Sequence, residues 1–289
     1  MPAVATTWAA ETGDTLSPAH YARLAEILNR ELGIKLPSNK RLMLEGRIRP
    51  RMRTLGYSSY QGYCSHLFDQ GGLQEEMAFL IDAATTNKTD FFREPSHFSL
   101  LTQKLVPALL PRRAASSMPL IKIWSAASSY GAEPYTIAMV MQELVRARSG
   151  FRFAVLGTDI STRVLSQAVR AIYPADQVEP VPPKLAERYL LKSLDPGAKE
   201  VRISPELRRL VRFSRLNLMD KTYPVDRDVD VIFLRNVLIY FEKHDQEAVV
   251  RRLIGHLRPG GYLVLGHSEA MIGSALGLRQ VAPAVFEKD

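Results

Sequence analysis

The fold is indicated by one stretch, Ile-Lys-Ile-Trp-Ser-Ala-Ala-Ser-Ser-Tyr-Gly-Ala-Glu-Pro, which runs from Ile121 to Pro134. Its first four residues form a short, mostly apolar run with β-branched side chains, which is typical of a central strand in a parallel sheet. The following side chains are small, so a ligand can approach the backbone closely. Proline then favours the first turn of a helix, and an amphipathic pattern over residues 135–146 continues it. This order predicts an open α/β sheet with a ligand site at the turn, although an ordinary strand–helix junction has the same pattern.

The next predicted strand, residues 151–158, ends in Asp159. An acidic residue at the end of the second strand is well placed to accept hydrogen bonds from ribose hydroxyl groups. The turn after the first strand lacks the Gly-x-Gly-x-x-Gly spacing, which argues against a dinucleotide pyrophosphate. A nucleoside without phosphates fits better, and S-adenosylmethionine is the commonest such cofactor in this kind of fold.

Composition indicates the kind of partner and the location of the protein more than its activity. The formal net charge is +8, which favours an acidic partner: a nucleic acid, an anionic membrane or an acidic protein surface. Cys64 is the only cysteine, so we expect a reduced cytoplasmic location and interpret Cys64 as a buried small hydrophobe. The N-terminus has no signal-peptide pattern and no long apolar stretch occurs, so we expect a soluble protein without direct membrane insertion.

The N-terminal part reads as helical. Residues 1–15 are small and polar and are expected to be disordered, and residues 16–84 are predicted to form an all-helical domain. Its second helix, about residues 39–55, is strongly basic, and Pro50 should kink or restart it. Three interpretations of the basic run remain open: a solvated helix face, a nucleic-acid contact, or a contact with an acidic helix of a partner protein.

Residues 85–289 alternate between predicted strands and helices, which implies a parallel sheet with helices on both faces. Further core strands are expected at residues 211–218, 230–234 and 262–266, and a last strand at 284–288. The proline-rich segment 173–209 is too long for a simple crossover, and we interpret it as an insertion. The predicted class is therefore a Rossmann-like α/β domain preceded by an all-helical domain.

Five segments, taken in order, resemble a known family. They are Thr-Asn-Lys-Thr-Asp-Phe-Phe-Arg-Glu (86–94), Trp-Ser-Ala-Ala-Ser-Ser-Tyr-Gly-Ala-Glu-Pro-Tyr-Thr-Ile-Ala-Met (124–139), Gly-Thr-Asp-Ile (157–160), Arg-Asn-Val-Leu-Ile-Tyr-Phe (235–241) and Gly-His-Ser-Glu (266–269). The resemblance is to the CheR-type methyltransferases, which methylate glutamates on bacterial chemoreceptors, and it extends from about Ser17 to Phe286. Tyr130 and Ala132 depart from the family pattern, which has a small hydroxyl residue and a glutamate there.

The resemblance implies a cofactor, a substrate and their contacts. It implies S-adenosylmethionine, with S-adenosylhomocysteine as product, at Asn87, Thr89, Arg93, Glu133, Asp159, Asn217, Leu218, Arg235 and Asn236. It also implies that residues 173–209 form the family's small β-subdomain, and that the basic helix grips the receptor's methylation helix through Lys40, Arg47, Arg51 and Arg53. Some members bind a receptor C-terminal tether peptide at the β-subdomain, and the sequence leaves this partner open. No metal and no nucleic acid are expected.

The implied chemistry needs little acid–base assistance. Free glutamate has a pKa near 4.3, so at neutral pH it is already a carboxylate that can attack the sulfonium methyl group in line. One arginine or tyrosine suffices to orient this carboxylate, and the candidates are Arg93 and Tyr240. His267 is not expected to act as a general base, because no proton must be removed. The alternatives are a nucleic-acid methyltransferase and a non-catalytic adaptor, and the Asn/Asp-Pro-Pro-aromatic motif common in the former is absent at Arg235-Asn236-Val237.

Overall fold

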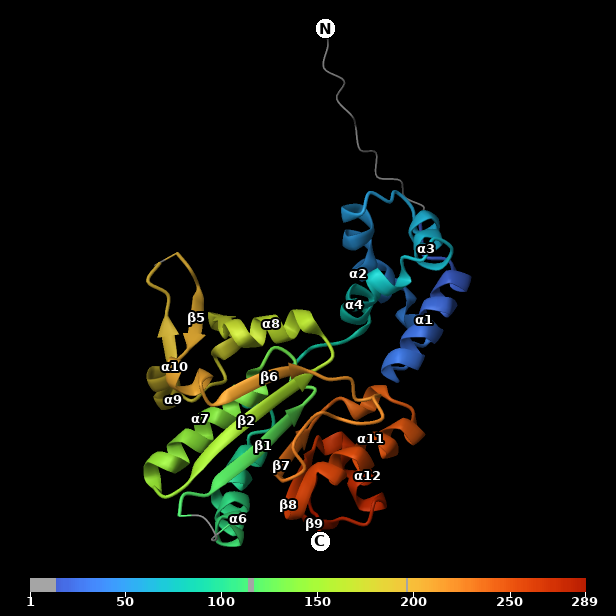
Figure 1. Ribbon diagram of the computed structural model, residues 1–289. Coiled ribbons are helices and arrows are strands. Elements are labelled where there is room, and N and C mark those ends of the chain that lie inside the picture. The colour runs from blue at the N-terminus through green and yellow to red at the C-terminus, as the bar shows by residue number, and fades with distance from the viewer. Residues whose placement is uncertain (1–13, 114–116, 196) are drawn as a thin grey trace. The chain divides into compact units, whose positions relative to one another are not determined.

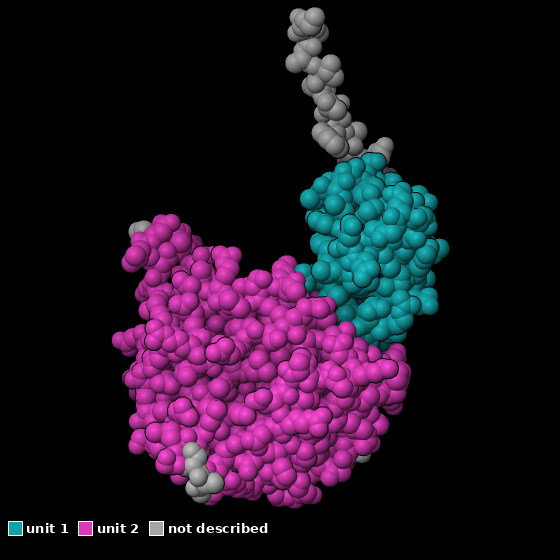
Figure 2. Space-filling model, in the orientation of Figure 1, with its two compact units in different colours: residues 1–84 teal, residues 85–289 magenta. Residues whose placement is uncertain are grey.

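The computed structural model describes residues 14–113, 117–195 and 197–289, and the chain forms two compact units that divide between Ala84 and Thr85 (Figure 1, Figure 2). The first unit is helical and the second is α/β. The expectation of a disordered N-terminus concerns residues 1–15, of which residues 1–13 lie outside the described ranges.

The helical unit contains α1 (Pro18–Leu32), a short 3-10 turn η1 (Ser38–Lys40), α2 (Arg41–Thr54), α3 (Tyr60–Phe68) and α4 (Leu73–Ala84). The start and end of α1 follow from its sequence. The Ser17 side chain accepts a hydrogen bond from the His20 N–H at 3.2 Å, and Gly33 ends the helix with a φ of 67°. Cys64 is fully buried on α3, as expected for a small hydrophobe, and burial raises the pKa of its thiol to about 11.

Pro50 was expected to kink or restart α2; a restart is excluded, since one helix runs through Pro50 to Thr54. Proline has no N–H to donate to the carbonyl group four residues earlier, which belongs to Gly46. Both Gly46 and Pro50 are exposed, so water can satisfy that carbonyl group and the interruption costs less than it would in a buried helix.

The α/β unit is built on a seven-stranded sheet with the order β6-β2-β1-β7-β8-β10-β9. The strands are β1 (Leu120–Ala126), β2 (Arg152–Asp159), β6 (Val211–Arg215), β7 (Val229–Leu234), β8 (Leu257–Leu265), β9 (Arg279–Ala282) and β10 (Val285–Glu287). Neighbouring strands from β6 to β8 are parallel, whereas β10 is antiparallel to both β8 and β9. This topology confirms the predicted Rossmann-like class.

Helices cover both faces of the sheet. They are α5 (Ser96–Leu100), which continues through a π-helical turn η2 (Leu101–Leu105) into α6 (Val106–Arg112), then α7 (Ala132–Ala147), α8 (Thr162–Arg170), α9 (Pro183–Tyr189), α10 (Pro205–Arg208), α11 (Lys243–His256) and α12 (Ala270–Ala275). Alternate residues of each strand point to opposite faces. Ile123 and Phe233 therefore pack with α5, α6 and α7, and Trp124 and Ile232 pack with α11.

The segment predicted as an insertion carries a second, smaller sheet. Its three antiparallel strands have the order β3-β5-β4, with β3 at Ile172–Pro174, β5 at Glu200–Ile203 and β4 at Leu190–Lys192. Tyr189, at the end of α9, and Tyr173 are fully buried, and both belong to the same core cluster as α7. The small sheet is therefore anchored to the large one through aromatic side chains.

Several strand predictions differ from the structure. The strand expected at residues 211–218 ends at Arg215, although the Leu216 N–H still donates to the Asp159 carbonyl group at 2.9 Å. The strand expected at residues 262–266 is longer, since β8 begins at Leu257 and ends at Leu265. The edge strand β9 was not predicted. Its residues are mostly exposed, so its sequence lacks the alternation of apolar and polar residues that marks a half-buried strand.

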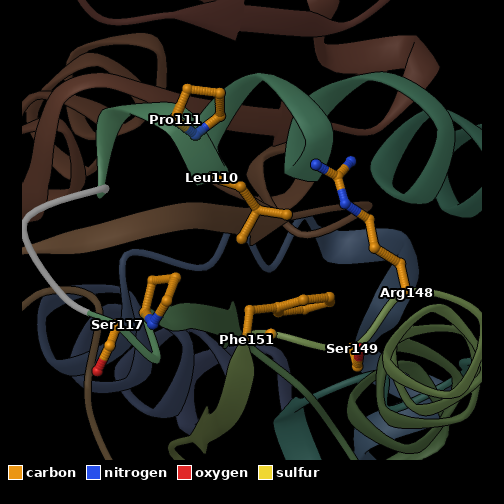
Figure 3. A pocket seen from close by; sticks show the side chains of 8 residues that line it. Leu110, Pro111, Ser117, Arg148, Ser149 and Phe151 are labelled. Atoms are coloured by element: carbon orange, nitrogen blue, oxygen red, sulfur yellow. The ribbon is translucent and has the colours of Figure 1, made fainter.

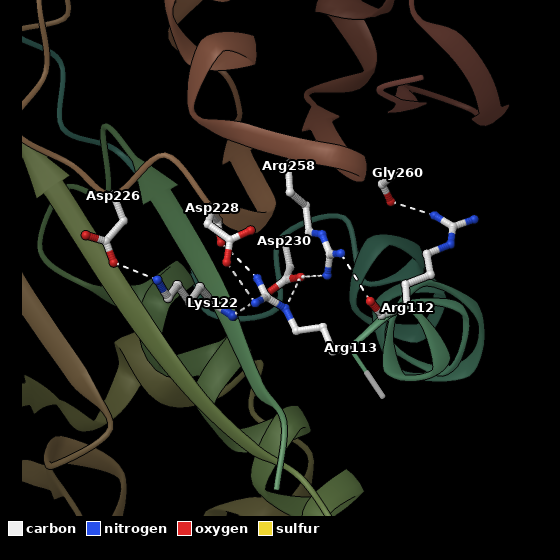
Figure 4. A network of polar contacts seen from close by, with 8 residues as sticks. All are labelled: Arg112, Arg113, Lys122, Asp226, Asp228, Asp230, Arg258 and Gly260. Atoms are coloured by element: carbon white, nitrogen blue, oxygen red, sulfur yellow. Dashed lines mark hydrogen bonds and ion pairs between the residues drawn. The ribbon is translucent and has the colours of Figure 1, made fainter. Parts of the chain in front are cut away.

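The amino ends of the strands are held by a polar network (Figure 4). Asp230, fully buried at the start of β7, accepts hydrogen bonds from Arg113 Nε at 2.8 Å and Arg113 Nη2 at 2.9 Å. The Lys122 backbone N–H donates to the same carboxylate at 2.8 Å, and an Arg258 nitrogen lies 3.4 Å from it. The third guanidinium nitrogen of Arg113 bonds Asp228 at 2.8 Å, so this fork is fully used inside the protein.

Candidate cofactor site

The turn between β1 and α7 is the first part of the site. Ala127 and Ser129 have φ values of 57° and 50°, and Gly131 has a φ of 92°. A β-carbon on Gly131 would lie about 3.0–3.1 Å from Ala168, Phe213 and Tyr173, so only glycine fits there. Left-handed backbone at non-glycine residues costs free energy and is frequent at functional sites. The turn thus keeps a strained shape at the carboxyl end of the central strand.

Asp159 lies at the end of β2, beside this turn. It is 7% exposed, and its two carboxylate oxygens accept the N–H groups of Ser129 at 2.8 Å and Ser161 at 3.0 Å. These backbone donors fix the carboxylate at the edge of the sheet, and a carboxylate can accept about four hydrogen bonds. The position suits the ribose contact that the sequence predicts.

Arg235 is the centre of the site. It follows β7, its side chain is 3% exposed, and it lies between two carboxylates, Glu133 at 2.9 Å and Glu94 at 3.1 Å. The guanidinium also donates to the Arg93 carbonyl group and lies over the Phe98 ring. Burial opposes ionisation of Glu94, but the charge and hydrogen bond of Arg235 together hold the pKa of Glu94 below its ordinary value.

Buried polar atoms without a hydrogen-bond partner in the described chain occur at this end of the sheet. They include the Arg235 Nε and, in the β1–α7 turn, the Ser128 Oγ. Buried donors and acceptors are rarely left unpaired in native proteins. Orphaned polar atoms beside a strained turn therefore fit a site that a polar ligand completes.

The segment 86–94 is tied to the same turn through its backbone. Ser129 Oγ donates to the Asn87 carbonyl group at 2.7 Å, and the Tyr130 hydroxyl donates to the Thr89 carbonyl group. Burial raises the pKa of Tyr130 to about 12, so this hydroxyl stays a donor. The departure from the family pattern at Tyr130 thus has a physical role, because its side chain anchors the segment that precedes Arg93.

Asn236 and Tyr240 are positioned by a buried carboxylate. Glu269, 1% exposed, accepts the N–H groups of Asn236 at 2.8 Å, Leu238 at 2.8 Å and Gly266 at 2.9 Å. Burial raises the pKa of Glu269, and the backbone hydrogen bonds oppose that rise. Tyr240 follows on the 3-10 turn η4 (Leu238–Tyr240) and is partly buried. Glu269 therefore organises the loop that carries both predicted residues.

Asn217 and Leu218 lie after β6, the strand next to β2. The Asn217 side-chain oxygen accepts the Met219 N–H at 3.0 Å, and the Leu218 carbonyl group accepts the Tyr223 hydroxyl at 2.7 Å. Asn217, Leu218 and Asp159 thus follow the carboxyl ends of adjacent strands, which is where open α/β sheets bind ligands.

The four basic residues proposed to grip a receptor lie in the helical unit and differ in exposure. Arg51 forms hydrogen bonds of 2.9 and 3.2 Å with Glu76, which is 3% exposed, and Arg47 donates to the Ala83 carbonyl group at 3.1 Å. Lys40 and Arg53 are exposed. The basic run in the sequence therefore did not show that Arg47 and Arg51 bind groups on α4, which lies later in the chain.

Sequence reasoning missed several residues of the site. They are Glu94, Ser125, Ser128 and Glu269, together with His97.

The available signal was the family resemblance itself, because Glu94 and Glu269 both belong to segments quoted for it, 86–94 and 266–269. Their partners among the predicted site residues, Arg235 for Glu94 and Asn236 for Glu269, lie more than thirty residues away along the chain, so neither periodicity nor spacing points to these pairs.

A shallow hollow elsewhere on the α/β unit is not part of this site (Figure 3). Its lining includes Leu110, Pro119, Arg148 and Phe151. Pro119 and Phe151 directly precede β1 and β2, so the hollow lies at the amino ends of the strands, opposite the edge that carries Arg235.

Fold and site together define an S-adenosylmethionine-dependent methyltransferase. Residues 19–85 match the family model described as "CheR methyltransferase, all-alpha domain", and residues 87–284 match "CheR methyltransferase, SAM binding domain". The chain therefore belongs to the CheR methyltransferase family.

Named relatives agree with this assignment. The chain is 35% identical over 269 residues to a chemotaxis protein methyltransferase of Borreliella burgdorferi, with 93% of each chain covered. It is 38% identical over 254 residues to that of Salmonella typhimurium, covering 88% of this chain and 84% of the relative. None of the described helices is both long and apolar enough to cross a membrane.

Proposed function

We propose that this protein uses S-adenosylmethionine to methylate glutamate side chains on the cytoplasmic methylation helices of chemoreceptors. The observation that carries the proposal is the contact between Arg235 and the Arg93 carbonyl group. It joins the arginine at the centre of the cofactor site to the residue that we expect to orient the substrate carboxylate.

The cofactor contacts follow from the placement of the side chains. Asp159 would accept hydrogen bonds from the ribose hydroxyl groups, and Glu133 with Arg235 would hold the charged amino-acid end. Asn87, Thr89, Asn217, Leu218 and Asn236 would complete the contacts, together with Arg93. When bound, the cofactor supplies a methyl group on a positively charged sulfur, which a carboxylate can attack directly.

Arg93 and Tyr240 would orient the substrate. The Arg93 side chain is partly exposed, and its hydrogen bond to the Lys88 carbonyl group is long, at 3.4 Å. Charge is neutralised as the methyl group moves, so tight cationic binding of the carboxylate would stabilise the ground state more than the transition state. A loosely held arginine and a tyrosine hydroxyl therefore suit the task of alignment.

The receptor contact would use the basic helix α2. Lys40 and Arg53 are the best candidates, because their side chains are exposed, whereas Arg51 is paired with Glu76. Exposed charges of this kind act mainly on encounter rate and salt dependence. For receptors that carry a tether peptide, the edge strand β4 is the proposed docking place, since it pairs only with β5 among the described strands.

The test is transfer of tritiated methyl groups to membranes that contain chemoreceptors. We expect radioactivity on the receptor band that alkali releases as methanol, because glutamate methyl esters hydrolyse in base. Label on added RNA or DNA that alkali does not release as methanol would instead support a nucleic-acid methyltransferase. Cofactor binding by calorimetry without any transfer would support a non-catalytic adaptor.

A further inference from the structure

Three side chains that can ligate a metal converge behind the cofactor site. They are Glu94, two residues before α5, His97 in the first turn of α5, and His267, which begins the 3-10 turn η5 (His267–Glu269) two residues after the end of β8. Their ligand atoms all lie within 4.8 Å of one another. The Glu94 Oε2 is 3.1 Å from the His267 Nδ1 and 3.4 Å from the His97 Nδ1.

These separations fit a shared metal ion. Zinc bonds to imidazole nitrogen and carboxylate oxygen are about 2.0–2.2 Å, so neighbouring ligands of a tetrahedral ion lie about 3.3 Å apart. Two of the three atom pairs already have this spacing. A small rotation of the two imidazole rings, whose centroids are 4.8 Å apart, would be needed to complete the set.

The burial of the His97 ring is a second, independent observation that supports a bound ion. The residue is 3% exposed, and within the described chain its ring nitrogens make no hydrogen bond of good geometry; the Pro283 backbone offers only a weak one. A buried imidazole without a well-formed hydrogen bond is unusual.

The surroundings indicate which ions the cluster would accept. His267 is half exposed, which gives an ion access from solvent and leaves a position for water. The Arg235 guanidinium, 3.1 Å from the Glu94 Oε2, repels a cation and partly cancels the charge of Glu94. Hard ions such as Mg²⁺ and Ca²⁺, which need several oxygen ligands, are therefore disfavoured relative to ions that prefer imidazole.

We propose that Glu94, His97 and His267 form a binding site for a divalent transition-metal ion of the zinc and cobalt kind. An ion bound there would compete with Arg235 for Glu94. Because Arg235 also pairs with Glu133 at the cofactor site, metal binding should weaken cofactor binding.

Cobalt and zinc titrations of the chelator-treated full chain test the site. We expect one Co²⁺ ion per chain, with visible absorption bands of a nitrogen- and oxygen-ligated ion, and displacement by Zn²⁺. His267→Ala should weaken binding about tenfold or more. His244→Ala is the matched control, because His244 is 81% exposed on α11 and pairs with the neighbouring Asp245, and it should leave metal affinity unchanged.

Three results would overturn the proposal. They are no saturable binding up to on the order of 1 mM metal ion, equal affinity in His267→Ala, or loss of affinity in His244→Ala. The proposed effect of metal on cofactor binding is tested separately, by measuring the affinity for S-adenosylhomocysteine by calorimetry with and without Zn²⁺. Zinc should lower the affinity of the wild type and leave that of His267→Ala unchanged, and an unaltered wild type would remove the competition for Glu94.

Discussion

Two arginines at opposite ends of β7 each bind two carboxylates, Arg113 with 17% of its side chain exposed and Arg235 with 3%. At the amino end, Arg113 bonds Asp228 and Asp230 through all three guanidinium nitrogens (Figure 4). At the carboxyl end, Arg235 also has two carboxylate partners, Glu94 and Glu133, but its buried Nε has no hydrogen-bond partner among the described residues. A completed fork holds strands together, whereas an incomplete one is prepared for a ligand.

The backbone shows the same contrast. Most of the described non-glycine residues with positive φ gather near the carboxyl end, namely Phe92, Glu94, Ala127, Ser129 and Asn236. No non-glycine residue of the network in Figure 4 has a positive φ. Strain of this kind persists only where the surrounding structure enforces it, and it is frequent at binding sites.

The largest expected effect comes from removing the Asp230 carboxylate that binds the Arg113 guanidinium. Asp230→Ala removes a fully buried carboxylate and leaves Arg113, whose side chain is only 17% exposed, without its main partner. We expect this change to lower the free energy of unfolding by about 3 kcal/mol in urea titrations. Asp226→Ala is the control, because Asp226 is exposed and pairs with Lys122 at the surface, and it should cost less than about 1 kcal/mol. Equal losses in the two variants would show that the buried network contributes nothing special.

At the carboxyl end, the change should appear in ligand binding. Asp159→Ala removes the carboxylate expected to accept ribose hydroxyl groups, so cofactor affinity should fall by about 1–3 kcal/mol in calorimetry. Saturating cofactor should also raise the melting temperature of the wild type more than that of the variant. An unchanged affinity would remove Asp159 from the site.

A third arginine pair, Arg51 and Glu76 in the helical unit, extends the comparison. Hydrogen bonds from Arg51 hold the pKa of Glu76 below its ordinary value, although burial opposes this. A lowered carboxyl pKa adds stability above about pH 4.5, and that stability is lost as the pH falls through the lowered value. Glu76→Gln should therefore lower stability by about 1–2 kcal/mol at pH 7 and flatten the loss in acid. A variant that retains the wild-type pH profile would contradict a structural role for this pair.

The smallest effect belongs to the exposed charges of α2. Lys40→Ala combined with Arg53→Ala should slow methyl transfer to receptor without changing cofactor affinity, with about 0.2–1 kcal/mol for each charge. Raising the ionic strength should reproduce the defect in the wild type, because exposed charges are screened beyond about 10 Å at 0.1 M salt. Normal transfer by the double variant at every salt concentration would exclude these residues from the receptor contact.

The sequence predicted where the site lies in the fold better than it predicted the contacts between the side chains of the site. Small residues after an apolar run located the β1–α7 turn, and Asp159 could be placed because the end of a strand is a local feature. The environment of Arg235 could not, since Glu94 and Glu133 lie 141 and 102 residues earlier in the chain. Arg51 was taken as a surface residue for the same reason, because its partner Glu76 is 25 residues away.

Pairing Arg235→Met with Arg113→Met in one calorimetric experiment tests the central claim most directly. We predict that Arg235→Met loses at least about tenfold in affinity for S-adenosylhomocysteine, a cost of about 1.4 kcal/mol. Arg113→Met should be the less stable variant in urea yet bind with wild-type affinity. If Arg113→Met loses the ligand and Arg235→Met keeps it, the cofactor site is not at the carboxyl end of β7.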